Sequence, residues 1–435
     1  MDRLFGFREK GTNIPREVLA GLTTFLTMVY IVVVNPAVLE KSGMDFGAVF
    51  VATVVASALS TLIMGLFANY PIAIAPGMGL NAYFAYSVVG NGQIGWEVAM
   101  GAVLVAGILF LILSVTRFRE ALIQAIPPSL KFGITAGIGL FIAFVGLKSA
   151  GIIINDEVNL VGLGDFHSPE TLLSLFGLFA TLVLMTLRVP GALFLGMLLT
   201  AVGAWIVGLF QFPENWVTWP PSVAPTFGAA VTALPQVFEQ GLYAVIFAFL
   251  LVTLFDTTGT MIGVAEQAGL VKEGKFPRMR AALMADAVGV TTGAVMGTSP
   301  TSAYVESTTG VAVGGRTGFT AVVVSLLFLG TLFFEPLVAK IAGLSAITAP
   351  VLIIVGCLMM SGLSKVQWDE FEEAFPAFIV MLSMPLTFSI ATGIAFGFIT
   401  YPLLKLVRGK GKEVHPLLYL FMVLFILQLT FLPEA

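Results

Sequence analysis

The chain has 435 residues, of which 58% are hydrophobic and only 11% charged, and its mean hydropathy is +0.99. Because charged residues make up about a quarter of an average soluble sequence, this composition excludes an ordinary water-soluble protein and predicts a polytopic membrane protein in contact with lipid. The net charge of −4 excludes nucleic acid as a partner, and a single cysteine with two histidines outside the apolar runs excludes a disulfide and a zinc-type metal site.

Apolar stretches long enough to cross about 30 Å of hydrocarbon follow a basic segment, 1–17, that lacks the pattern of a cleaved signal peptide and is expected to be a cytoplasmic tail. They lie at 18–38, 47–67, 98–115, 130–148, 169–187 and 191–210. Between the second and third of these, residues 70–89 are apolar but interrupted by Pro71, Pro76, Gly77 and Gly79. This spacing predicts extended backbone followed by a short half-helix.

The second half of the chain repeats this layout. Its apolar stretches lie at 235–265, 280–297, 318–335, 343–362, 374–387 and 391–407. Its third span, 297–315, is again interrupted, by Pro300. We therefore expect an all-α membrane protein with 14 transmembrane segments, arranged as a 7+7 inverted repeat in which the third and tenth spans are broken. Residues 415–431 are also apolar, and their topology is left open.

The distribution of basic residues predicts the orientation. With the N-terminus in the cytoplasm, Lys41, Lys148 and Lys340 fall on the outer side and Lys131 falls at an inner helix end. All other lysines and arginines fall in the N-terminal tail or in inner loops. Such an excess is typical of cytoplasmic loops, so the sequence predicts a multi-pass protein of the cell inner or plasma membrane with a cytoplasmic N-terminus.

Three carboxylates fall within apolar segments, namely Asp256, Asp286 and Glu306. Each costs about 2.5 to 3.5 kcal/mol to insert at the centre of a membrane helix, so each requires a physical reason. Helical spacing places Thr260 one turn from Asp256 in a polar stripe. Glu306 is expected near the beginning of the second half-helix. The same offset that separates Pro76 from Pro300 relates Glu306 to Ala82 in the first interrupted span, beside Asn81.

These features predict a ligand site at mid-membrane. The free N–H groups of a broken helix can hold polar ligand atoms, and neighbouring carboxylates supply hydrogen-bond acceptors. Asp256, Asp286 and Glu306 are also candidates for proton coupling, because intramembrane carboxylates commonly relay protons. A purely structural role is the alternative for each of them, and most readily for Asp286. Tyr304 is expected either to stack on a flat ligand or to serve in ordinary packing.

Three long motifs carry a resemblance to a known family. The strings APGMGLNAYFAY at 75–86, LFDTTGTMIG at 254–263 and GTSPTSAYVESTTGVAVGGRTG at 297–318 resemble the AzgA-like purine permeases of the nucleobase:cation symporter (nucleobase–ascorbate transporter) superfamily. The resemblance implies a core domain of spans 1–4 and 8–11, at 1–125 and 234–336, and a gate domain at 126–233 and 337–435. It also implies elevator-like movement of the core against the gate.

The same resemblance implies roles for individual residues. Asp256 and Glu306 match the acids that hydrogen-bond the nucleobase, Gly79 and Asn81 match the binding pattern of the third span, and Asp286 matches the functional acid of the ninth span. Uracil and xanthine carriers have a glutamate at the position of Asp256, and some relatives have a histidine at the position of Thr260. These two differences favour adenine, guanine or hypoxanthine as substrate. The remaining candidates for substrate binding are Ala82, Tyr304 and Thr27.

The resulting functional hypothesis is a proton-coupled purine importer without enzymatic activity or cofactor, and with a homodimer as a possible assembly. Two other classes are weighed against it. An ion channel or anion exchanger on the same repeat would favour a positive centre at mid-depth, whereas this chain places acids there. A membrane enzyme would require a nucleophile–base pair or metal-ligand spacing, which the spans lack.

Overall fold

A computed structural model describes residues 2–90, 92, 94–116, 125–270 and 277–431. The basic segments 117–124 and 271–276, which contribute to the predicted orientation through Arg117, Arg119, Lys272 and Lys275, lie outside the described residues. The elements of the first half are α1 (Asp2–Phe5), α2 (Ile14–Met28), α3 (Ile31–Glu40), α4 (Phe46–Ile63), the π-helix η1 (Met64–Ala68), β1 (Ile74–Pro76), α5 (Met78–Ala82), the π-helix η2 (Tyr83–Val88), α6 (Trp96–Val115), α8 (Pro128–Ser149), β2 (Ile153–Asp156), β3 (Leu160–Leu163), α9 (Pro169–Thr186) and α10 (Ala192–Ile206).

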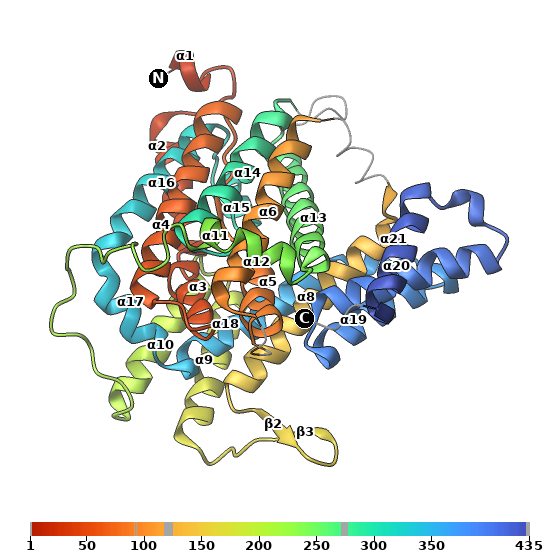
Figure 1. Cartoon of the computed structure of the whole chain (residues 1–435). Coiled ribbons are helices and arrows are strands. Elements are labelled where there is room, and N and C mark those ends of the chain that lie inside the picture. Colours follow the sequence, from red (N-terminus) through yellow and green to blue (C-terminus); the bar gives the residue numbers. More distant parts are fainter. Residues whose placement is uncertain (1, 91, 93, 117–124, 271–276, 432–435) are drawn as a thin grey trace.

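The second half is also mainly helical (Figure 1). Its elements are α11 (Ala229–Thr232), α12 (Leu234–Glu239), α13 (Tyr243–Gln267), α14 (Met279–Met296), β4 (Thr301–Ala303), α15 (Ser307–Ala312), α16 (Gly318–Thr331), η3 (Leu332–Phe334), α17 (Glu335–Ala342), α18 (Ser345–Met359), η4 (Met360–Lys365), α19 (Phe371–Thr387), α20 (Ile390–Val407), η5 (Gly411–Glu413) and α21 (Pro416–Phe431).

Nine segments within the described residues are long and apolar enough to cross a membrane, and α10 and α21 are shorter apolar helices. The chain is therefore a mostly helical, polytopic membrane protein. The all-α expectation is corrected in one respect, since two small antiparallel sheets are present. One is the hairpin of β2 and β3, where the Asp156 carboxylate accepts hydrogen bonds from the backbone N–H groups of Val158 and Asn159, which lower the pKa of Asp156.

The second sheet joins the two interrupted spans. Strands β1 and β4 pair in antiparallel register, with Ile74 opposite Ala303 and Pro76 opposite Thr301. Beyond the strands, the Gly77 N–H donates to the Pro300 carbonyl at 2.9 Å. Extended backbone within a membrane must have its polar groups satisfied by protein, and each interrupted span supplies these partners to the other. Both spans thus consist of an extended segment followed by a short helix, as the prolines and glycines predict.

The N-terminal tail is shorter than expected because α2 already begins at Ile14. Asn13 caps this helix by accepting from the Arg16 N–H. Glu17, assigned to the tail in the sequence interpretation, is fully buried and accepts hydrogen bonds from the hydroxyls of Thr317 and Thr320 at 2.8 and 2.6 Å. A carboxylate at the beginning of α16 is stabilised by the positive end of the helix dipole, which explains its burial.

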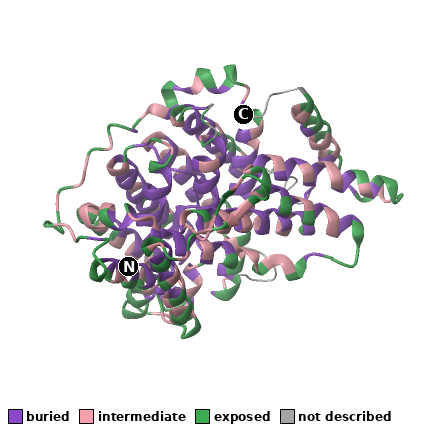
Figure 2. Cartoon of the chain, turned by 90° about the horizontal axis from the view of Figure 1, so that it is seen from below, coloured by how far each residue is buried: buried purple, intermediate pink, exposed green. Residues whose placement is uncertain are grey.

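The helices form two packing groups. In the first, α14 packs on α4 and α6, α16 packs on α2 and α4, and α13 packs on α6 and on β4. In the second, α8 packs on α18 and α19, and α19 packs on α20. Glycines permit the close contact of α8 with α18, since a Cβ built on Gly139 would lie 2.6 Å from the Gly356 carbonyl oxygen. Buried residues concentrate where the helices meet (Figure 2).

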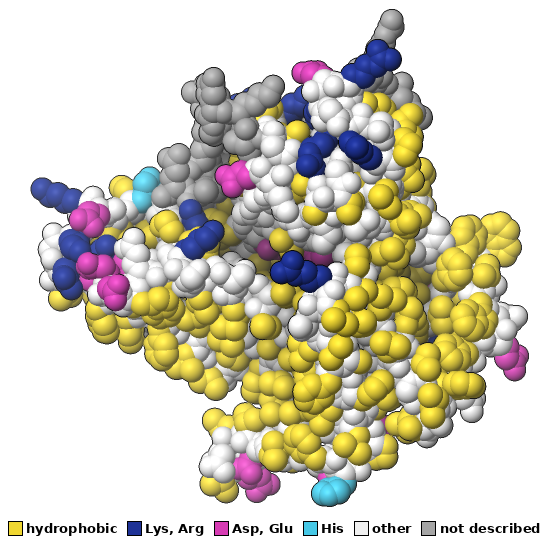
Figure 3. Space-filling model, turned by 180° about the vertical axis from the view of Figure 1, so that it is seen from behind, with side chains coloured by type: hydrophobic (Ala, Val, Ile, Leu, Met, Phe, Trp, Pro, Cys, Tyr) yellow, Lys and Arg dark blue, Asp and Glu magenta, His cyan; other side chains and the backbone are white. Residues whose placement is uncertain are grey.

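Charged and hydrophobic side chains occupy different parts of the surface. Lysine and arginine side chains gather in the upper half of Figure 3, toward the end that carries α1 in Figure 1, and hydrophobic side chains cover much of the middle and lower parts. Near the centre of this view, acidic side chains are visible inside a hollow with a basic side chain at its rim.

Candidate functional site

A cavity of about 650 Å³ lies where the interrupted spans meet the second packing group. The first group contributes the turns around β1 and β4 and the middle of α13, including Asp256, Thr260 and Glu306. The second contributes α8 and the end of α18 with η4, including Thr135 and Met359. Two carboxylates from distant parts of the sequence therefore line a single cavity at the level of the broken helices.

Glu306 is positioned by a hydrogen bond from another span. It precedes α15 and is partly exposed to the cavity, while the buried Tyr30, between α2 and α3, donates its hydroxyl to Glu306 Oε1 at 2.8 Å. Tyr30 lines the cavity as well. With one oxygen held by Tyr30, the carboxylate has a defined orientation and retains further lone pairs to accept from a ligand.

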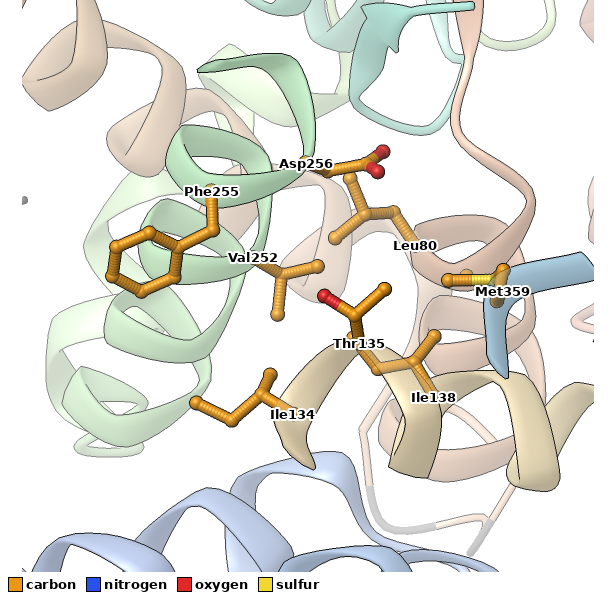
Figure 4. Close-up of a pocket in the computed structure, with 9 residues that line it drawn as sticks. Leu80, Ile134, Thr135, Ile138, Val252, Phe255, Asp256 and Met359 are labelled. Carbon is orange, nitrogen blue, oxygen red and sulfur yellow. The ribbon is translucent and has the colours of Figure 1, made fainter. Parts of the chain in front are cut away.

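Asp256 lies in the middle of α13. It also lines a chamber of about 20 Å³, which shares several residues with the main cavity and has room for about one water molecule. In Figure 4, Asp256 and Val252 from α13 lie near Leu80 from α5 and near Thr135 and Ile138 from α8. The carboxylate thus stands at the boundary between the two packing groups.

Tyr304 and Gly79 line the main cavity too. The Tyr304 hydroxyl donates to the Pro76 carbonyl at 2.5 Å, which fixes its ring against the other interrupted span. Gly79 belongs to α5, and a Cβ built there would lie 2.4 Å from Ile138 Cγ2. Glycine at this position therefore permits close approach of the half-helix to α8.

Asn81 lies outside the cavity lining, in a buried polar network. Its amide donates to Asn35 Oδ1 at 3.1 Å, and Asn35 donates in turn to the hydroxyls of Thr53 and Thr298. Ser299 also donates to Asn35 Oδ1. This network joins the first interrupted span to α3, α4 and the residues preceding β4.

Three other candidates also lie away from the cavity lining. Asp286 is fully buried and accepts from the hydroxyls of Thr257 and Thr301 at 2.5 and 3.3 Å, which ties α14 to α13 and β4. Thr27 donates to the Thr24 carbonyl and lies 3.1 Å from the Thr309 hydroxyl. Ala82 is buried at the end of α5.

The sequence interpretation did not select several residues that line the cavity. These are chiefly Tyr30, Lys131, Thr135, Ser302 and Lys365. The hydroxyl of Tyr30 within an otherwise apolar stretch is a signal that sequence inspection can detect. Thr135, by contrast, has no distinguishing neighbour, because only the packing of α8 against α13 brings it to the site.

A polytopic helical chain with a cavity that holds two carboxylates at the level of broken spans has the architecture of a membrane transport protein. Comparison with protein families agrees, since the model described as "Permease family" matches residues 15–396. The chain belongs to this permease family, which confirms the family-level expectation and places it among transporters rather than enzymes.

Its relatives match over nearly the whole chain. It is 56% identical to the guanine/hypoxanthine permease PbuO of Bacillus subtilis (strain 168), over 99% of this chain and 100% of that protein. It is 46% identical to the adenine permease AdeP of Escherichia coli (strain K12), over 99% of this chain and 96% of that protein.

Solved structures share the fold at low sequence identity. The transmembrane domain of the cyanobacterial bicarbonate transporter BicA is 14% identical, with a TM-score of 0.65, and the match covers 87% of this chain and 97% of that one. SLC26A9 is 12% identical with a TM-score of 0.61, covering 90% of this chain and 66% of that one. At these identities the likeness concerns the fold alone.

Proposed function

We propose that the protein imports purine nucleobases, namely adenine, guanine or hypoxanthine, as a secondary active transporter of the plasma membrane. The observation that carries this proposal is the cavity in which Asp256 and Glu306 face the same space. The guanine/hypoxanthine and adenine permeases among its relatives support the substrate class.

The cavity suits a neutral, flat heterocycle with N–H donors on its edge. Glu306 and Asp256 accept from ring or exocyclic N–H groups, and hydrogen bonds to charged acceptors are about twice as strong as those between neutral groups. Tyr304 and Phe255 supply aromatic surface in the same cavity. Gly79 and Thr260 border the site, whereas Asn81, Ala82 and Thr27 support it from behind the lining.

The proposed mechanism is elevator-like alternating access. Residues 1–125 and 234–336 form the core that carries the base, and residues 126–233 and 337–435 form the gate, within 14 spans of a 7+7 inverted repeat. The site lies between α13 and α8, one from each unit, so that sliding of the core carries the bound base past the gate. The coupling ion is H⁺, carried by Glu306 or Asp256, with Asp286 as a third candidate. The N-terminus is cytoplasmic, and a homodimer is a possible assembly.

The test is uptake of radiolabelled adenine, guanine and hypoxanthine in permease-deficient cells, with unlabelled bases as competitors. Asp256→Asn is expected to reduce uptake at least about a hundredfold, because it replaces an acceptor by a group that also presents donors. Glu266→Gln, an exposed carboxylate on the same helix α13, is the matched control and retains uptake. Full activity of Asp256→Asn would refute its role, and failure of every purine to compete would refute the substrate class.

Proton coupling has a separate test. Uptake is expected to rise when the external medium is acidified and to collapse when a protonophore dissipates the gradient. Uptake that is independent of external pH and resistant to the protonophore would remove H⁺ as the coupling ion and leave the substrate class standing.

A further inference from the structure

The small chamber beside Asp256 has a largely apolar wall. Of the nine described residues that border it, those that lie outside the lining of the main cavity are all apolar: Leu80, Ile134, Ile138 and Val252. Among the same nine residues, Asp256 from α13 and Thr135 from α8 carry the oxygen-bearing side chains. A space for about one water molecule is therefore bordered by two polar groups, one from each packing group.

Both polar groups are hydrogen-bond acceptors for a ligand. The Thr135 hydroxyl donates to the Lys131 carbonyl at 3.2 Å, so its hydrogen is used within α8 while its oxygen keeps lone pairs. Asp256 accepts a hydrogen bond from the side chain of Ser302, and a carboxylate has several further lone pairs. In Figure 4, Asp256 and Thr135 lie on opposite sides of the chamber. A group that fits between them and satisfies both must offer two hydrogens.

The exocyclic amino group of a purine meets this requirement. It is similar in size to a water molecule and carries two N–H donors. In guanine, the ring N1–H and one amino N–H lie along the same edge, where a single carboxylate can accept both, and the other amino N–H points away from that carboxylate. Hypoxanthine has the N1–H but no amino group at position 2, so a water molecule would remain in the chamber when it binds.

We propose that the chamber is the subsite for the 2-amino group of guanine, with Asp256 accepting from N1–H and one amino N–H and Thr135 accepting from the other. This inference rests on the proposed function and adds that Thr135 determines specificity at position 2 of the purine. The amino group takes the place of the water molecule, against the apolar wall that includes Ile138 and Val252. An oxo group in the same place has no hydrogen to donate to either acceptor, so the site disfavours xanthine.

The test measures displacement of radiolabelled hypoxanthine from the purified full-length protein by unlabelled guanine, hypoxanthine and xanthine. These three bases share the oxo group at position 6 and differ chiefly at position 2. The wild type is expected to bind guanine at least about fivefold more tightly than hypoxanthine, because the amino group adds hydrogen bonds at the chamber. Xanthine is expected to bind at least about a hundredfold more weakly than guanine, because its oxo group leaves both acceptors unpaired.

Thr135→Val is the decisive variant, since valine has nearly the same shape as threonine and lacks the hydroxyl. The preference for guanine over hypoxanthine should fall about fivefold, because one amino N–H loses its partner, whereas a general disturbance of the site would weaken both bases alike. Thr135→Ser keeps a hydroxyl and should keep the preference. Thr400→Val is the matched control, because Thr400 also donates to a carbonyl four residues earlier, that of Phe396, but lines neither the chamber nor the main cavity.

Three results would overturn the inference: no preference for guanine in the wild type, a preference that persists in Thr135→Val, or xanthine bound as tightly as guanine. Adenine and unsubstituted purine, which differ only in the 6-amino group, test the other orientation of the base. A preference for adenine over purine that depends on Thr135 would place the 6-amino group in the chamber and overturn the assignment to guanine.

The failure of this inference is distinguishable from that of the proposed function. If the wild type binds no purine base, the proposed function fails. If the bases bind with the same preference in the wild type and in Thr135→Val, the proposed function stands and only the role of Thr135 is refuted.

Discussion

The two interrupted spans have the same backbone plan but place their polar side chains differently. In each, a three-residue strand leads into a short helix, and the strands pair with one another. In the second span, Glu306 faces the cavity with its carboxylate held by Tyr30. In the first, Asn81 is fully buried and bonds to Asn35 away from the cavity.

This difference distinguishes residues that support the site, such as Asn81, from residues that face the ligand, such as Glu306. A neutral amide can be buried in a network of hydroxyls and amides at modest cost, whereas a carboxylate needs a ligand, a proton or a strong donor. We infer that the first interrupted span mainly holds the geometry and the second mainly contacts the substrate. Substitution of Asn81 in the first span should therefore mainly lower stability, and substitution of Glu306 in the second should mainly lower uptake.

The largest effect is expected from Glu306→Gln. This substitution keeps the size of the side chain but removes the charged acceptor, so uptake should fall by about a hundredfold or more. The Tm of the purified protein should change little, because the variant can still accept a hydrogen bond from Tyr30. Uptake near the wild-type rate would show that the second span does not carry the ligand-facing carboxylate.

A smaller loss, about tenfold, is expected from Gly79→Ala. The new Cβ would lie 2.4 Å from Ile138 Cγ2, so α5 and α8 must separate at the surface where the proposed core slides on the gate. Adding Ile138→Ala removes the clash and should recover much of the uptake. If the double variant is no better than Gly79→Ala alone, the loss does not arise from this contact.

The sequence predicted much of this frame because its signals are local. Pro76, Pro300 and the neighbouring glycines indicate where the helices break, and Glu306 stands out as a charge in an apolar stretch. The pairing of β1 with β4 joins residues more than two hundred positions apart and leaves no local signal. The same holds for Glu17, whose burial depends on Thr317 and Thr320 at the beginning of a distant helix.

The contrast between Asn81 and Glu306 shows the limit of inference from repeat positions. The offset between the two halves relates Glu306 to Ala82, beside Asn81, and suggested polar groups at equivalent depth. The direction of each side chain depends on its neighbours, however: Asn35, the partner of Asn81, lies away from the cavity, whereas Tyr30, the partner of Glu306, lines the cavity itself. The shared plan of a strand followed by a short helix therefore does not determine which side chains face the cavity.

Tyr30→Phe tests how strongly the orientation of Glu306 matters. The substitution removes the 2.8 Å hydrogen bond to Oε1 and keeps the ring, so the apolar packing is retained. A hydrogen bond to a charged group contributes about 1.5–3 kcal/mol, and water can replace part of it here, so a loss of uptake of up to about tenfold is expected. Tyr83→Phe, a buried ring outside the cavity lining, is the control. Equal uptake by Tyr30→Phe and the wild type would show that Glu306 is oriented without this tyrosine.

The smallest effect on substrate affinity is expected from Asn81→Ala, and this variant decides whether the first span acts as a frame. It removes the donor to Asn35 Oδ1, while Ser299 still donates to the same oxygen. The free energy of unfolding should fall by about 1–3 kcal/mol, which a lowered Tm would reveal, because a buried acceptor loses one partner and a small cavity opens. The affinity of the purified protein for a purine base should stay within about twofold. A large loss of affinity without a change in Tm would reverse the assignment and place Asn81 among the substrate ligands, since only direct contact with the base separates affinity from stability in this way.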